Sequence, residues 1–120
     1  MTMSELNAER LIELLKKSFV KENAAGVNTC VQFNLAGANG GNWFMKIKNQ
    51  AIEVQNGSTD DANAEINIKT NDFLGIITGE LDPLKAFFTG KIKIIGDQSA
   101  VMKLVSLFRV NEDDLKQLQQ

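Results

Sequence analysis

The sequence contains no histidine and no tyrosine, and it has one cysteine, Cys30, and one proline, Pro83. Histidine is the side chain that most often transfers protons at neutral pH, so its absence argues against an enzyme, although carboxylates could do such work. A lone cysteine cannot form an intramolecular disulfide, which agrees with a reducing compartment. We therefore expect a protein without catalytic residues.

Long apolar runs and excess basic charge are also missing. No stretch approaches the roughly 20 apolar residues that a membrane-spanning helix needs. The net charge of −2 and the pI of about 5.1 argue against nucleic acid as a partner and against electrostatic docking on an anionic membrane. The amino-terminal residues carry no signal-peptide pattern. We expect a cytoplasmic protein that forms one domain over residues 1–120, with at most transient membrane contact.

Two short motifs have a chemical interpretation and a simpler structural one. Gly37 and Gly40 have the spacing of a nucleotide-clamping loop, but no lysine or arginine stands beside them, so a hairpin loop is the better interpretation. Asp60, Asp61 and Glu65 could hold a divalent cation, but the spacing of an EF-hand loop is absent. The sequence thus predicts no metal site and no cofactor.

Alternation of apolar and polar residues predicts five strands, separated by polar or glycine-containing turns. Within the first strand, Cys30 and Gln32 fall on the polar face, which we expect to be exposed to solvent. The outward residues Phe44 and Ile95 break the polar pattern, and indicate either a dimer contact or scattered surface side chains. The predicted strands span residues 27–35, 43–48, 52–55, 65–69 and 91–95.

Helical spacing and capping residues predict four helical segments. The first has apolar residues at helical spacing from Ala8 to Phe19, with Thr2 or Ser4 as its N-cap and Gly26 as its stop. Asn71 is the expected N-cap of the second, which Gly79 ends. Asp82 and Pro83 are the favoured pair for the N-cap and first position of the third helix. The last helix is expected to begin near residue 97 or 99 and to continue through residue 108.

These elements predict an α+β fold in which helices cover one face of a mixed, mainly antiparallel five-stranded sheet. The two helices between the fourth and fifth strands suggest a crossover, so we expect those two strands to run parallel. Apolar side chains from the helices and from the inner sheet face would meet under this cover. The pattern alone does not decide whether they fill a solid core or leave a cavity.

The stretch GELDPLKAFFTGKIKIIGDQSAVMKL, residues 79–104, resembles the signature of the sterol carrier protein type 2 family of non-specific lipid-transfer proteins. The matching elements include Pro83, the Ala86-Phe87-Phe88 triplet, the strand after Gly90 and the Met102-Lys103-Leu104 segment. The order of the elements agrees over nearly the whole chain. The resemblance implies a sheet and covering helices that enclose an apolar tunnel, with the last helix as a lid.

The resemblance also implies a function. The tunnel would bind, and could transfer, fatty acids, fatty acyl-CoA, sterol-like lipids or phospholipids with little selectivity. Val105 replaces a glutamine of the family pattern, so the lid is more apolar, which favours acyl chains over sterols. The expected cavity-lining residues are Phe33, Trp43, Met45, Phe73, Ile77, Leu84, Phe87, Phe88, Met102, Val105 and Phe108.

Two other interpretations stay open at this point. A filled core would leave a non-catalytic dimerisation or interaction module, so the sequence does not choose between a monomer and a homodimer. An acyl-thioester hydrolase that uses a carboxylate in the pocket is a third interpretation, and no residue pattern favours it.

Overall fold

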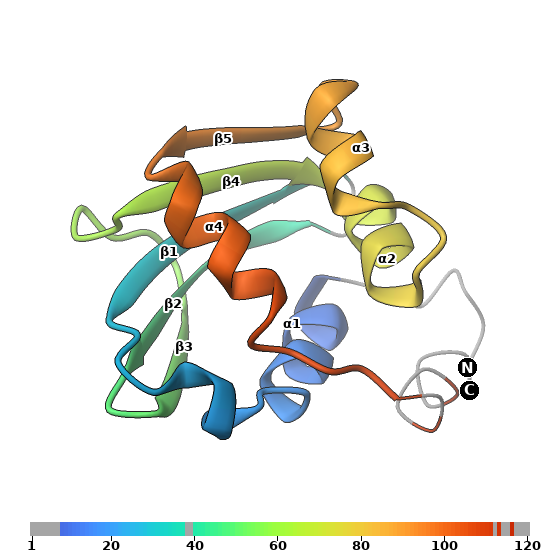
Figure 1. Ribbon diagram of the computed structural model, residues 1–120. Coiled ribbons are helices and arrows are strands. Elements are labelled where there is room, and N and C mark those ends of the chain that lie inside the picture. The colour runs from blue at the N-terminus through green and yellow to red at the C-terminus, as the bar shows by residue number, and fades with distance from the viewer. Residues whose placement is uncertain (1–7, 38–39, 112, 114–115, 117–120) are drawn as a thin grey trace.

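A computed structural model describes residues 8–37, 40–111, 113 and 116, and it shows one open five-stranded sheet with helices against one face (Figure 1). This arrangement confirms the predicted α+β fold. No helix within these ranges is both long and apolar enough to cross a bilayer. The elements are α1 (Ala8–Lys17), η2 (Lys21–Ala24), β1 (Thr29–Ala36), β2 (Gly41–Lys48), β3 (Ala51–Asn56), β4 (Ala64–Lys69), α2 (Thr70–Thr78), α3 (Pro83–Phe88), β5 (Ile92–Gly96) and α4 (Gln98–Val105).

The strand order is β3-β2-β1-β4-β5, and only the central pair β1–β4 is parallel within the described sheet. The prediction that the fourth and fifth strands run parallel was wrong, because Ile66 pairs with Ile94 and Ile68 with Ile92 in antiparallel register. The reason is that α2 and α3 lie together at one end of the sheet (Figure 1). They turn the chain back, so β5 starts beside the end of β4 instead of beside its beginning.

The parallel pair arises from the segment between β3 and β4. This segment, residues 57–63, carries the chain from the edge strand β3 past β2 and β1 to the far side of the sheet. Its last residue is joined to β1, since the Asn63 backbone N–H donates to the Cys30 carbonyl at 2.7 Å and the Cys30 N–H donates to Asn63 Oδ1 at 2.9 Å. The chain therefore enters β4 in the same direction as β1.

Two outer-face residues of β1 are buried, contrary to expectation. Cys30 is 8% exposed and Gln32 is 3% exposed. The 57–63 segment covers them, because Gln32 Nε2 lies 3.1 Å from both the Trp43 and the Gly57 carbonyl oxygens, and Gln32 Oε1 accepts from the Thr59 N–H at 3.0 Å. The alternation of apolar and polar residues correctly predicted that these side chains lie on the outer sheet face. It did not reveal that the 57–63 segment covers that face.

The hairpin between β1 and β2 explains the paired glycines. A Cβ at Gly40 would come within 2.0 Å of the Leu35 carbonyl oxygen, and Gly37 has a φ of 118°, which favours glycine. The Gly40 N–H also donates to the Gly37 carbonyl at 3.1 Å. Backbone geometry is therefore sufficient to account for this spacing.

The two ends of the fold are joined to each other. The Val20 N–H donates to the Leu107 carbonyl and the Arg109 N–H donates to the Ser18 carbonyl, both at 2.8 Å. The rings of Phe19 and Phe108 stack at a tilt above this bridge, with centroids 5.9 Å apart. The last helix accordingly ends at Val105, and the prediction that it reaches residue 108 was wrong. The first helix ends at Lys17, so the expected stop at Gly26 was wrong as well, while its expected caps, Thr2 and Ser4, lie outside the described residues.

We predict that Gln32→Ala lowers the free energy of unfolding by about 2–3 kcal/mol, because it removes the bonds to the Gly57 carbonyl and the Thr59 N–H of the covering segment and to the buried Trp43 carbonyl of β2. Urea unfolding followed by circular dichroism measures the change. Gln55→Ala is the matched control, since Gln55 is exposed on β3 and bonds only to Glu53 among the contacts described. Equal stability losses in the two variants would contradict this role for Gln32.

Candidate functional site

The helices that flank the site begin and end at recognisable capping residues. Asp82 Oδ1 accepts from the Leu84 N–H at 2.8 Å and Pro83 takes the first helical position, which confirms the predicted start of α3. Gly79 ends α2 with a φ of 84°, also as predicted. Asn71 is not the N-cap of α2, because the helix begins at Thr70 and Lys69 takes the N-cap position. The Thr70 Oγ1 donates to the Ala36 carbonyl at 3.0 Å.

Under these helices lies a cavity of about 310 Å³. It occupies the β1–β4–β5 half of the inner sheet face, and α2, α3, α4 and the carboxyl-terminal segment close it from the other sides. Its volume is at the lower end of the range of about 300–1,000 Å³ that is typical of small-molecule sites. The lining residues are Leu15, Phe33, Ile66, Ile68, Phe73, Ile76, Ile77, Pro83, Phe87, Ile92, Ile94, Val101, Met102, Leu104, Val105, Phe108 and Val110.

The side chains of the cavity wall are all apolar, since every lining residue has an aliphatic, aromatic, thioether or proline side chain. Binding an alkyl chain or ring against such a wall is favourable, by roughly 25 cal/mol for each Å² of apolar surface that is removed from water. A charged group would lose its hydration there without gaining a side-chain partner. The cavity is thus suited to the hydrocarbon part of a ligand, and a polar head would have to stay at its opening.

Two residues of α4 mark the opening. Met102 and Val105 line the cavity, yet their side chains are 40% and 55% exposed. Asp97 begins this helix by accepting from the Ala100 N–H at 3.2 Å, while Val101 and Leu104 on its inner side are buried. The helix therefore directs Val101 and Leu104 into the cavity, while Met102 and Val105 lie at its opening.

Seven of the predicted lining residues come together in the wall: Phe33, Phe73, Ile77, Phe87, Met102, Val105 and Phe108. They come from β1, α2, α3, α4 and the segment after α4. The rings of Phe33 and Phe73 meet at a centroid distance of 6.1 Å. The structure shows that these side chains share one cavity; that they bind a ligand stays a prediction.

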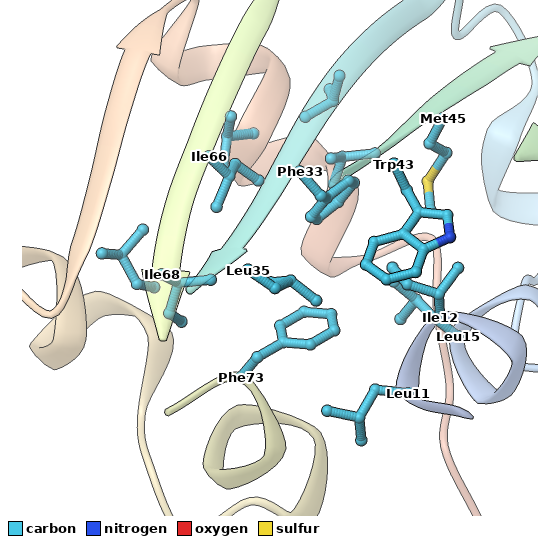
Figure 2. Close-up of a cluster of buried hydrophobic side chains, with 14 of the residues drawn as sticks. Leu11, Ile12, Leu15, Phe33, Leu35, Trp43, Met45, Ile66, Ile68 and Phe73 are labelled. Carbon is cyan, nitrogen blue, oxygen red and sulfur yellow. The ribbon is translucent and has the colours of Figure 1, made fainter. Parts of the chain in front are cut away.

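Four predicted residues do not lie in the wall. Trp43 and Met45 belong to β2, where α1 packs directly on the sheet, and Figure 2 shows Trp43 beside Ile12 and Leu15. Leu84 and Phe88 point away from the cavity and are 51% and 76% exposed. A helix as short as α3 directs only some of its apolar residues inward, and Pro83 and Phe87 are the ones that line the cavity.

The sheet residues Ile66, Ile68, Ile92 and Ile94 were missed as cavity residues, although their alternation identified them as inward-facing. Finding them required the strand order, which places β4 and β5 next to each other beneath the helices. Leu15 and Val110 were missed because their contribution depends on the pairing of the two chain ends.

Other candidate chemistry lies away from the cavity. Among the residues with described positions, no cluster of three or more His, Cys, Asp or Glu side chains could hold a metal ion. Burial raises the pKa of the Cys30 thiol; Lys46 lowers it and Asp61 raises it to a lesser extent. Phe44 is half-buried and has Lys46 Nζ 5.7 Å from its ring centroid.

We expect the Cys30 thiol to react with iodoacetamide far more slowly in the native chain than in urea, because it is buried and its thiolate is disfavoured. The unfolded thiol loses its proton first, so stability should fall as the pH rises above about 8.5 towards the folded pKa. Cys30→Ala should lack that part of the fall. Equal labelling rates for native and unfolded protein would contradict the prediction.

Together, the one-sided mixed sheet and the apolar cavity beneath its helices define a fold built around an apolar binding site. Residues 8–109 match the SCP-2 sterol transfer family, and the chain belongs to that family. Membership supports lipid binding or transfer in general terms.

Two groups of known proteins are similar to this chain. Hydroxysteroid dehydrogenase-like protein 2 of Mus musculus is 33% identical over 100 residues, which cover 82% of this chain and 20% of the mouse protein. This chain therefore spans about a fifth of that relative's length. Sterol Carrier Protein 2 Like 2 from Aedes aegypti is 22% identical with a TM-score of 0.65, covering 83% of this chain and 94% of that one.

A similar fold also occurs inside a larger enzyme. The sec-alkylsulfatase Pisa1 from Pseudomonas sp. aligns with a TM-score of 0.80 at 16% identity, covering 91% of this chain and 17% of the sulfatase. At this identity the comparison supports the fold alone.

Proposed function

We propose that the chain binds one acyl chain of a fatty acid, a fatty acyl-CoA or a similar lipid in the apolar cavity, and that it transfers such lipids without chemical change. The observation that carries this proposal is the set of apolar side chains around an open volume of about 310 Å³. The tunnel with the last helix as its lid, which the family resemblance implies, is part of the same prediction.

The cavity volume favours a single chain. At about 30 Å³ for a group the size of a water molecule or methylene, 310 Å³ holds roughly ten such groups. A fused sterol ring system with its tail is larger and rigid, so it would require the helices to move apart. The Aedes protein has also been solved in a palmitated form, which agrees with an acyl chain in this fold.

The expected affinity is moderate. Burying ten methylenes contributes about 8 kcal/mol, at about 0.8 kcal/mol each. Association costs about 4–15 kcal/mol in lost translational, rotational and internal freedom. Because no polar side chain lines the wall, specificity for the head group is expected to be low. A ligand held in this way can be released as readily as a carrier requires.

A catalytic role is not part of the proposal. None of the seventeen lining side chains is titratable, so the wall offers no general acid, base or nucleophile to an ester or thioester. Incubation with an acyl-CoA, followed by mass spectrometry, tests this point directly. Release of free fatty acid at a rate that depends on the protein would contradict it.

We predict that Ile94→Trp weakens the binding of a fluorescent fatty acid about thirtyfold, the value expected if the indole excludes two to three methylenes. Ile94 lines the cavity from β5. Ile95→Trp is the matched control, because Ile95 follows Ile94 in the sequence but lies on the opposite sheet face and is 60% exposed. Displacement titration with palmitate measures the affinity. If wild-type protein shows no saturable binding, or if both variants bind like wild type, the proposed site is wrong.

A further inference from the structure

Two aromatic side chains separate the cavity from the solid core beneath α1. Phe33 lies on β1, the strand between β2 and β4. Its cross-strand neighbour on one side is Trp43 of the core, and its neighbour on the other side is Ile66 of the cavity wall. Phe73 of α2 meets the Phe33 ring at a centroid distance of 6.1 Å. We call the rings of Phe33 and Phe73 the aromatic partition.

The space behind the aromatic partition is filled. In Figure 2 the Phe33 ring lies between Ile66 and Trp43. Beyond it, Trp43 packs beside Ile12 of α1, and both side chains are buried outside the cavity wall. Close-packed protein interiors contain few voids as large as a water molecule. Neither ring of the partition can therefore move into the core without displacing other side chains.

The cavity has an open end at α4 and a closed end at the aromatic partition. Met102 and Val105 line the cavity and are exposed, whereas Phe33 and Phe73 line it and are only 4% and 7% exposed. A fatty acid would keep its carboxylate at the open end, because the wall offers no polar side chain to replace the water around the charge. The methyl end of the chain would then point towards the partition.

We propose that the aromatic partition limits the length of acyl chain that the protein can bury. The proposal rests on the proposed function and adds a chain-length preference to it. The cavity of about 310 Å³ holds roughly ten methylene-sized groups, so a chain of about ten to twelve carbons fills it. The additional carbons of a longer fatty acid stay in water at the open end, where they contribute little to the affinity.

Affinities for saturated fatty acids from octanoate to palmitate test the limit, with displacement of a fluorescent fatty acid as the measurement. We expect the wild-type affinity to rise about fourfold for each methylene up to about ten to twelve carbons and then to level off. In Phe33→Ala and Phe73→Ala, the loss of a phenyl ring should admit about three more methylenes. The ratio of palmitate to decanoate affinity should then rise about tenfold or more in each variant.

Two control variants lose comparable groups elsewhere. Phe87→Ala removes the same ring from α3, where Phe87 is half-buried, so it widens the cavity without opening the core. Met45→Ala removes a buried side chain from the core and leaves the partition in place. Phe87→Ala should weaken the binding of all chain lengths alike, and both controls should level off at the wild-type length. Phe33→Leu should raise the ratio less than Phe33→Ala does, and it keeps the test available if an alanine variant does not fold.

Trp43 provides a second measurement that does not depend on affinity. It is the only tryptophan of the sequence, and it lies directly behind Phe33. Bromine quenches tryptophan fluorescence at short range. Dodecanoate with bromine on its terminal carbon should therefore quench Trp43 more strongly than dodecanoate with bromine beside the carboxylate, and Phe33→Ala should increase that difference.

Three results would overturn the chain-length limit while saturable binding still supports the proposed function. One is a wild-type affinity that keeps rising from dodecanoate to palmitate. Another is the same levelling-off length in wild type and both alanine variants of the partition, or an equal shift in the two controls. The third is equal quenching by the two brominated dodecanoates, which would place the methyl end elsewhere. If wild-type protein binds no fatty acid of any length, the proposed function and the limit both fail.

Discussion

The hydrogen bonds of the Gln32 side chain hold the 57–63 segment against the outer face of the sheet, and the order of the strands depends on that segment. Because it carries the chain to the far side of β1, β4 lies between β1 and β5, and β5 forms the edge of the sheet. The helices that follow β4 then cover the β4–β5 half, while α1 covers the other half. The cavity lies in the half that α1 does not fill.

The division of the inner sheet face explains why one apolar surface has both a solid core and a hollow. Beneath α1, Trp43 and Met45 are buried against aliphatic side chains, as Figure 2 shows. On the other half, α2 and α3 lie at the end of the sheet and α4 crosses it (Figure 1). The side chains of these helices leave a cavity of about 310 Å³ above the sheet. Stability and ligand capacity are thus provided by different parts of the same sheet.

Capping residues and apolar periodicity predicted most helices and strands, because these features depend on residues that are close together in the sequence. The Asp82-Pro83 start of α3 and the Gly79 end of α2 depend on capping geometry, which the sequence shows directly. The direction of β5, the burial of Gln32 and the exposure of Phe88 depend on contacts between distant segments. Of the predicted site, the residues on α2 and α4 were placed correctly in the wall, whereas Trp43 was assigned to the wrong half of the sheet. The alternation of apolar and polar residues shows on which face of the sheet each side chain lies, but it does not show which strands are adjacent.

The backbone contacts around α4 restrict how the cavity can admit a ligand. Before the helix, the Asp97 N–H is bonded to the Asn63 carbonyl at 3.0 Å; after it, the Leu107 carbonyl is bonded to the Val20 N–H. A helix of eight residues that is tethered at both ends cannot swing outward like a hinged flap without breaking one of these attachments. Rotation about the flexible bonds of Met102 requires no such break. Passage of a hydrocarbon tail would then be controlled by side-chain torsions at nanosecond rates, and the backbone could stay in place throughout.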